Sequence, residues 1–161
     1  MDNADIRAYR DILSHSVPFK GLNQALLTHI LNVGFILEAK AGDVVFFEKM
    51  RGGPGLYVVL SGKVEVFRAP KSRSTKPLRL NTLKPSDCFG EYSLIDRKES
   101  SASARALIAT KLYFLPHGAF TRLMQQNAET GRTVYHNLLL FLIERLRQKD
   151  KVPAKKTARK K

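Results

Sequence analysis

Near the N-terminus, hydrophobic residues recur at the three- and four-residue spacing of amphipathic helices. A first short helix is predicted over residues 5–13, and Pro18 separates it from a second helix that has Asn23 near its start. The second helix places its apolar residues on one face: Leu22, Leu26, Ile30 and Val33. Both helices are expected to serve packing and not to carry a site.

From residue 35 the pattern changes to short runs rich in Val, Phe, Tyr and Leu that are interrupted by Gly and Pro. Strands are predicted over residues 35–39, 44–47, 56–60, 63–67, 78–83, 102–107 and 111–115. Ser61 and Gly62 predict a hairpin turn, and the alternation that follows predicts a strand with one solvent-exposed and one buried face. The middle of the chain is therefore predicted to be a β-sandwich, jelly roll or barrel.

After Pro116 the helical spacing returns, first around Phe120 and Leu123 and then in a longer helix. Many residues make this longer helix apolar around much of its girth: Val134, Leu138, Leu139, Leu140, Phe141, Leu142, Ile143 and Leu146. We expect it to pack on the barrel and on a second copy of itself, giving a homodimer. Complete burial within its own domain is the alternative.

The length of 161 residues and the hydrophobic content of 43% fit one folded domain, predicted over residues 1–150. The longest apolar run covers residues 138–143, far short of a membrane span, and the N-terminus does not resemble a signal peptide. We therefore expect a soluble, cytoplasmic protein. Cys88 is the single cysteine, which excludes an intrachain disulfide and a multi-cysteine metal site.

The charge is strongly positive, with 28 Lys and Arg against 14 Asp and Glu, a net charge of +14. Residues 149–161 carry seven basic residues and one acidic residue, and residues 151–161 are predicted to form a disordered basic tail. A second basic cluster contains Arg68, Lys71, Arg73, Lys76, Arg79 and Lys84. Nucleic acid, an anionic membrane surface or a phosphorylated ligand are the expected partners, and a merely solubilising tail is the alternative.

Patterns typical of enzymes are missing from the sequence. There is no Gly-x-Ser-x-Gly motif, and the histidines are scattered singly: His15, His29, His117 and His136. We expect no catalytic residue and no bound metal.

One segment, residues 87–95, indicates a binding site. A glycine, Gly90, that leads into a short helical turn lets backbone N–H groups point at an anion. The Glu91 carboxylate beside it would repel a phosphate but accept hydrogen bonds from a sugar hydroxyl, so the pair suits a nucleotide. An ordinary strand-to-helix turn is the alternative interpretation.

Three pieces of sequence resemble the cyclic nucleotide-binding domain family in order and spacing: Ala-Gly-Asp-Val-Val-Phe at residues 41–46, residues 56–67, and Phe-Gly-Glu at residues 89–91. The likeness extends over roughly residues 19–148 and points to a sensor domain of the catabolite-activator type. It implies a mainly β fold, with an eight-stranded jelly-roll barrel (a double-stranded β-helix), N-terminal helices and a mobile long C-terminal helix. It also implies a phosphate-binding cassette, the segment that holds the cyclic phosphate of the ligand.

The resemblance assigns roles to residues of this cassette. Gly90 would sit against the ligand, Glu91 would hold the ribose hydroxyl, and the N–H groups of Tyr92 and Ser93 would face the phosphate. Ser101 matches the small residue that follows the arginine of the family. The base is expected to be capped by residues 148–150.

The sequence departs from the family at that arginine, because Ser100 stands in its place. A charge-assisted hydrogen bond to a buried anion contributes about 1.5–3 kcal/mol, so its loss weakens binding about ten- to a hundredfold. Glu99 next to it adds repulsion. Arg97, Lys98 and Arg105 are the candidate substitutes.

These observations lead to a hypothesis of a stand-alone, non-enzymatic signalling domain that binds a cyclic nucleotide such as cAMP or cGMP and responds through its C-terminal helix. We expect no base-reading helix-turn-helix after residue 150. One alternative is a family member that has lost binding and acts as a dimeric protein-interaction module. Another is nonspecific docking of the basic tail on nucleic acid.

Overall fold

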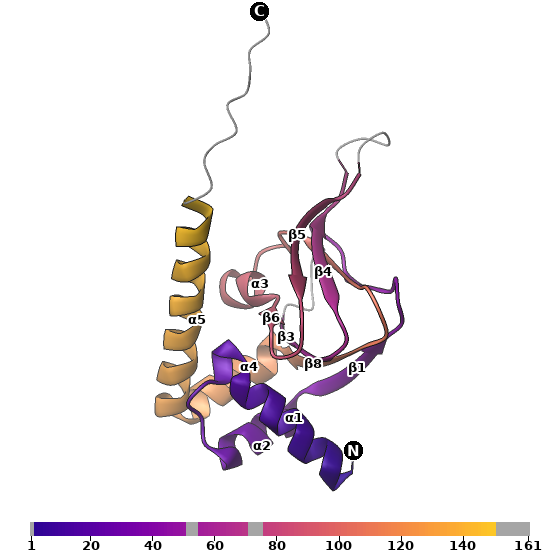
Figure 1. Cartoon of the computed structure of the whole chain (residues 1–161). Helices are drawn as coiled ribbons and strands as arrows, with labels where there is room; N and C mark the ends of the chain where they lie inside the picture. The colour runs from indigo at the N-terminus through magenta and orange to yellow at the C-terminus, as the bar shows by residue number, and fades with distance from the viewer. Residues whose placement is uncertain (1, 51–54, 71–75, 151–161) are drawn as a thin grey trace, which may run out of the picture.

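The computed structural model describes residues 2–50, 55–70 and 76–150 (Figure 1). Three helical elements come first, then a β-rich middle that contains one short helix, and finally two helices. The N-terminal elements are α1 (Asn3–His15), the 3₁₀ turn η1 (Val17–Phe19) and α2 (Gln24–Val33). The C-terminal helices are α4 (His117–Gln126) and α5 (Ala128–Asp150).

The middle of the chain forms two four-stranded antiparallel sheets, one in the order β1-β8-β3-β6 and the other in the order β2-β7-β4-β5. The strands are β1 (Phe35–Ala39), β2 (Val44–Phe46), β3 (Gly55–Ser61), β4 (Val64–Arg68), β5 (Leu78–Leu83), β6 (Cys88–Phe89), β7 (Ser103–Ala106) and β8 (Thr110–Pro116). The predicted jelly-roll fold with N-terminal helices and a long C-terminal helix is confirmed.

The predicted turn at Ser61 and Gly62 joins β3 to β4. Gly62 has a φ of +91°, and a Cβ there would lie 2.5 Å from the carbonyl oxygen of Ala109 and 2.4 Å from Thr110 Oγ1. A side chain is therefore excluded on two grounds, the left-handed backbone and the lack of space.

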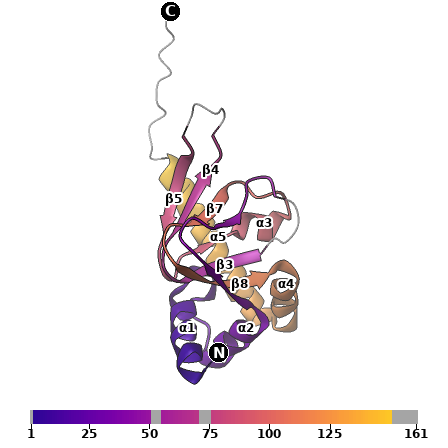
Figure 2. The same cartoon turned by 90° about the vertical axis from the view of Figure 1, so that its right-hand side faces the viewer.

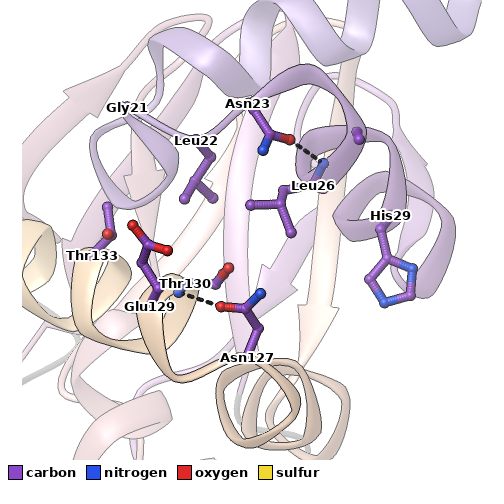
Figure 3. A pocket seen from close by; sticks show the side chains of 10 residues that line it. Gly21, Leu22, Asn23, Leu26, His29, Asn127, Glu129, Thr130 and Thr133 are labelled. Atoms are coloured by element: carbon purple, nitrogen blue, oxygen red, sulfur yellow. Dashed lines mark hydrogen bonds between the residues drawn. The ribbon is translucent and has the colours of Figure 1, made fainter.

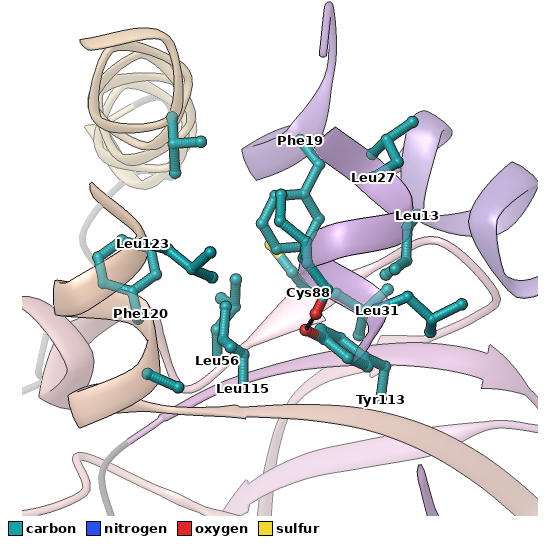
Figure 4. Close-up of a cluster of buried hydrophobic side chains, with 14 of the residues drawn as sticks. Leu13, Phe19, Leu27, Leu31, Leu56, Cys88, Tyr113, Leu115, Phe120 and Leu123 are labelled. Carbon is teal, nitrogen blue, oxygen red and sulfur yellow. Dashed lines mark hydrogen bonds between the residues drawn. The ribbon is translucent and has the colours of Figure 1, made fainter. Parts of the chain in front are cut away.

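Successive side chains of β3 point alternately into two separate hydrophobic cores. Leu56, Val58 and Leu60 face the helices, whereas Tyr57 and Val59 face the space between the sheets. The helix-side core draws buried residues from every part of the chain, as Figure 4 shows: Leu13, Phe19, Leu27, Leu31, Leu56, Tyr113, Leu115, Phe120 and Leu123. The Tyr113 hydroxyl, buried in this core, donates to the backbone carbonyl of Ile30.

The last helix packs differently from the expectation that it lies on the barrel. Its main neighbours are η1 and α4, with Val134 and Leu138 buried against them, and Figures 1 and 2 show it running along one side of the domain. Complete burial is excluded, because a large part of its apolar surface is exposed: Tyr135, Leu139, Leu140, Ile143 and Leu146.

The prediction that the polar side of β4 faces solvent is wrong at Glu65, because only 3% of this residue is exposed. Arg79 on β5 and Arg105 on β7 both bind its carboxylate, and the guanidinium of Arg105 lies 4.7 Å from the centre of the Phe67 ring. Two arginines from neighbouring strands therefore cover a residue that alternation alone places in solvent.

None of the helices in the described residues is both long enough and apolar enough to cross a membrane. The predicted tail, residues 151–161, and part of the second basic cluster, residues 71–75, lie outside the described residues.

Candidate functional site

The segment singled out in the sequence forms a tight strand–turn–helix unit. β6 pairs with β3, Gly90 follows with a φ of +84°, and α3 (Glu91–Asp96) begins directly after it. A Cβ on Gly90 would lie 2.5 Å from the carbonyl oxygen of Gly55 and 3.1 Å from Tyr57 Cδ2. Glycine is therefore required here by both backbone conformation and packing.

Leu94 anchors this turn, because its side chain is buried in the helix-side core. The first backbone bond of α3 runs from the N–H of Leu94 to the carbonyl of Gly90, at 3.1 Å. The N–H groups of Glu91, Tyr92 and Ser93 come before that bond and have no intrahelical acceptor. The N–H groups of Tyr92 and Ser93 are the two that the resemblance assigns to the phosphate.

Glu91 is almost completely buried, with 3% of its surface exposed, and its Oε1 forms an ion pair with Arg145 of α5. Burial raises the pKa of this carboxyl, and the nearby charge of Arg145 acts in the opposite direction. A buried carboxylate at the start of α3 is thus neutralised by a cation from the last helix.

Arg145 also contacts two aromatic rings. Its guanidinium carbon lies 5.9 Å from the centre of the Tyr92 ring and 5.0 Å from that of Phe141. These are cation–π distances, so the side chain of Arg145 is positioned by contacts from both α3 and α5. Sequence reasoning missed Arg145, since the contact with Glu91 spans 54 positions and no local pattern signals it.

Ser100, at the position of the family arginine, lies between α3 and β7 and pairs with the segment that follows β2. Its carbonyl accepts from the N–H of Lys49 at 2.8 Å, and its N–H donates to the carbonyl of Met50 at 3.3 Å. The Ser100 side chain is half-buried and that of Ser101 is exposed.

Two of the substitutes predicted for the arginine, Arg97 and Arg105, have other side-chain partners. Arg97 Nε donates to His117 Nε2 of α4 at 3.2 Å, and Arg105 is occupied with Glu65. The backbone N–H of Lys98 donates to Asp96 Oδ1 at 2.9 Å. Gln148, in the predicted base cap, donates to Glu144 within α5 at 3.2 Å. Arg145, from outside this segment, thus reaches the cassette residue Glu91.

An aromatic cluster lies between the sheets beside Gly90. The Tyr57 ring stacks on Phe89 at 5.0 Å and on Phe114 at 4.6 Å between centroids, and Phe46 lies 5.5 Å from Tyr57. Burial raises the pKa of Tyr57, so its hydroxyl stays protonated at neutral pH. The core next to Gly90 is therefore apolar and aromatic.

Reactive groups do not gather at this site. Burial raises the pKa of the Cys88 thiol, so the nucleophilic thiolate is strongly disfavoured. Among the residues that the structure describes, no three His, Cys, Asp or Glu side chains are grouped to hold a metal ion.

Comparison with known proteins places these features in context. The family model described as cyclic nucleotide-binding domain matches residues 36–127, more than half of the chain. The cyclic AMP receptor protein of Thermus thermophilus is 40% identical over 98 residues, which cover 61% of this chain and 43% of that protein. The chain thus spans less than half the length of this curated relative.

Solved structures agree with the fold. The crystal structure of the Thermus thermophilus catabolite activator protein superposes with a TM-score of 0.73 at 33% identity, over 84% of this chain and 60% of that chain. The N-terminal domain of a transcriptional regulator from Streptomyces coelicolor gives a TM-score of 0.75 at 25% identity, over 91% of this chain and 100% of that chain.

Proposed function

The chain belongs to the cyclic nucleotide-binding domain family, and on that premise we propose that it is a non-enzymatic regulatory domain. It binds a cyclic nucleotide beside α3 and passes the binding event to α5. The observation that carries the proposal is the ion pair between Glu91 of the cassette and Arg145 of the last helix. Through this contact a ligand at the cassette acts directly on α5.

In this proposal the cassette residues act in the roles that the family implies. The N–H groups of Tyr92 and Ser93 bind the cyclic phosphate, and Gly90 allows the backbone to approach it. Glu91 accepts a hydrogen bond from the ribose hydroxyl through the carboxylate oxygen that Arg145 leaves free. The hydroxyls of Ser100 and Ser101 act as additional donors.

Arg145 supplies the positive charge that Ser100 cannot provide. Its guanidinium carries five N–H donors, so it can bind Glu91 and a phosphate oxygen at the same time. A cation on α5 makes affinity depend on the position of that helix. Binding then stabilises the arrangement in which α5 lies against the cassette, by as much as the affinities for the two arrangements differ.

Phe114, the half-buried ring of the aromatic cluster, supports a ligand with a flat base, whereas Tyr57 and Phe89 are buried behind it. Aromatic side chains bind nucleobases by stacking, with little dependence on which base is present. This chemistry favours a nucleotide over inorganic phosphate, and it does not select between adenine and guanine.

The exposed apolar face of α5 supports a second element of the proposal, a homodimer. Tyr135, Leu139, Ile143 and Leu146 recur at four- and three-residue spacing along one side of the helix and are each at least one-third exposed. A second copy of the same helix offers a matching apolar surface. Dimerisation through α5 would connect the two cassettes.

The alternative is a dimeric interaction module that no longer binds nucleotide. It is favoured by one observation, that the carboxylate of Glu91 is already neutralised within the chain. In this alternative, the basic tail docks nonspecifically on nucleic acid.

Thermal unfolding with a panel of cyclic AMP, cyclic GMP and cyclic dinucleotides separates these functions. A ligand at a hundred times its dissociation constant stabilises the folded state by about 2.7 kcal/mol. The sensor function predicts such a shift with at least one cyclic nucleotide, and the interaction module predicts none.

A further inference from the structure

A cavity of about 440 Å³ lies between the start of α2 and the start of α5 (Figure 3). Its lining comes from two segments, residues 21–29 and residues 127–133, and includes no cassette residue. The volume is within the usual range of small-molecule sites. The cavity adjoins the opposite end of the helix that carries Arg145.

Two helix starts border this cavity. Asn23 Oδ1 accepts from the N–H of Leu26 and caps α2, and Asn127 Oδ1 accepts from the N–H of Thr130 and caps α5, each at 2.9 Å. Because both caps use the amide oxygen, both side-chain NH₂ groups remain as donors, and no acceptor for either is present among the described residues. The two helix dipoles add a positive potential at the same place.

A buried hydroxyl lies in the same wall. Thr130 is 4% exposed, and its Oγ1 has no hydrogen-bond partner in the part of the chain that the structure describes. Figure 3 shows this hydroxyl on the side of α5 that faces Leu22 and Leu26. A buried polar atom without a partner costs free energy, which a ligand group at this position would recover.

The other side chains that line the cavity are acidic at one end, polar at the other end and apolar between them. Glu129 and Thr133 are four positions apart and share one face of α5, which places a carboxylate at one end of the cavity. The two asparagines and His29 lie toward the other end. Leu22 and Leu26 form an apolar surface between the two ends.

We propose that this cavity is a second ligand site, which binds a small zwitterion of the amino-acid class. The carboxylate of the ligand accepts from the amide groups of Asn23 and Asn127 and from the Thr130 hydroxyl. Its ammonium group lies toward Glu129, and its hydrocarbon part covers Leu22 and Leu26. A ligand bound in this way bridges α2 and α5.

The experiment is thermal unfolding of the full chain with each of the twenty L-amino acids, and with acetate and ethylammonium as probes that carry one charge each. At least one amino acid is expected to raise Tm, while acetate and ethylammonium do not. Glu129→Gln is expected to weaken the binding of that amino acid about tenfold. Glu38→Gln, an exposed exchange of the same kind remote from the cavity, is expected to leave it unchanged.

Thr130→Val provides the second variant. Because the hydroxyl has no partner, this variant is expected to be at least as stable as the wild type, yet to bind the amino acid more weakly. Absence of any Tm shift at about 10 mM amino acid, or an equal shift in wild type, Glu129→Gln and Thr130→Val, would overturn the proposal. The response to cyclic nucleotides, measured in parallel, distinguishes failure of this cavity from failure of the cassette.

Discussion

Arg145, near the end of the last helix, forms an ion pair with Glu91, the first residue of α3, across 54 positions of the chain. The contact joins the segment predicted to bind a nucleotide to the helix predicted to move. In the proposed function, this ion pair connects the ligand site to the helix that responds.

Replacing Arg145 by an uncharged residue should destabilise the folded protein. Arg145→Met is expected to lower the free energy of unfolding by about 1–3 kcal/mol, because Glu91 is left buried without its partner. The pKa of Glu91 should rise further, since the charge that opposes the effect of burial is gone. Urea denaturation measures the loss of stability.

Two variants control this measurement. Arg147→Met removes an exposed arginine two positions further along α5 and is expected to change stability by less than about 0.5 kcal/mol. The double variant with Glu91→Gln and Arg145→Met should be more stable than Arg145→Met alone, because no buried charge remains. Equal stability of these two variants would contradict the assigned ion pair.

Some of this architecture could be predicted from the sequence. Strand β5 has the predicted bounds, and β1 does too, because period-two alternation and Gly or Pro boundaries are local signals. β6 was missed, since two residues are too few to show a period. Asn23, placed near the start of the second helix from the sequence, is the N-cap of α2.

Tertiary contacts between side chains could not be predicted in the same way. Which way Arg105 points depends on the register of β7 against β4, and the burial of Glu65 depends on arginines from two other strands. The pairing of Arg145 with Glu91 depends on the path of α5 after its turn from α4. None of these is encoded in a spacing within one segment.

Restoring the family arginine should strengthen binding. Ser100→Arg is expected to raise the affinity for a cyclic nucleotide about ten- to a hundredfold, from one charge-assisted hydrogen bond to the phosphate. Gln125→Arg adds the same charge on the exposed surface of α4 and should have little effect. Fluorescence titration with a labelled nucleotide provides the comparison, and equal affinities of the two variants would show that Ser100 does not face the phosphate.

The glycine of the cassette should be more sensitive than a glycine in open space. Gly90→Ala must adopt a φ near +84° and also displace the Gly55 carbonyl, whereas Gly42→Ala, at a φ of +91°, meets nothing within 4 Å. Gly42→Ala should lose about 1 kcal/mol and Gly90→Ala clearly more. Thermal unfolding of both variants tests the order, and a reversed order would be incompatible with the packing described.

Acid should destabilise the protein through Glu65. The hydrogen bond from Arg79 lowers the pKa of this carboxyl against the effect of burial, and Arg105 lowers it too. Because the folded-state pKa is lower than the unfolded one, the stabilisation is complete above the ordinary glutamate pKa. It is lost as pH falls below that value toward the folded-state pKa.

Glu65→Gln should therefore lose about 1–2 kcal/mol at neutral pH and show a shallower decline of stability in acid. The estimate is modest because 64% of the Arg79 side chain is exposed. Urea denaturation between about pH 3 and 7 measures both effects. Glu38→Gln, in an exposed ion pair with Lys111, is the matched control. If stability falls as steeply with decreasing pH in Glu65→Gln as in that control, Glu65 is not the group that makes the protein sensitive to acid.

The apolar face of α5 should hold two chains together. A double variant, Leu139→Glu with Ile143→Glu, is expected to convert a dimer into a monomer, because charges are costly at the centre of an apolar interface. Ile108→Glu, at an exposed apolar position outside α5, should leave the dimer intact. Sedimentation velocity distinguishes the two forms, and a monomeric wild type would exclude this interface.

The central claim is tested most directly by isothermal titration calorimetry of the purified chain with cyclic AMP and cyclic GMP, in wild type and in Glu91→Ala. A sensor domain gives saturable binding of at least one nucleotide, with affinity reduced at least about tenfold in Glu91→Ala. Absence of saturable heat at millimolar nucleotide, or equal affinity in both proteins, would contradict it.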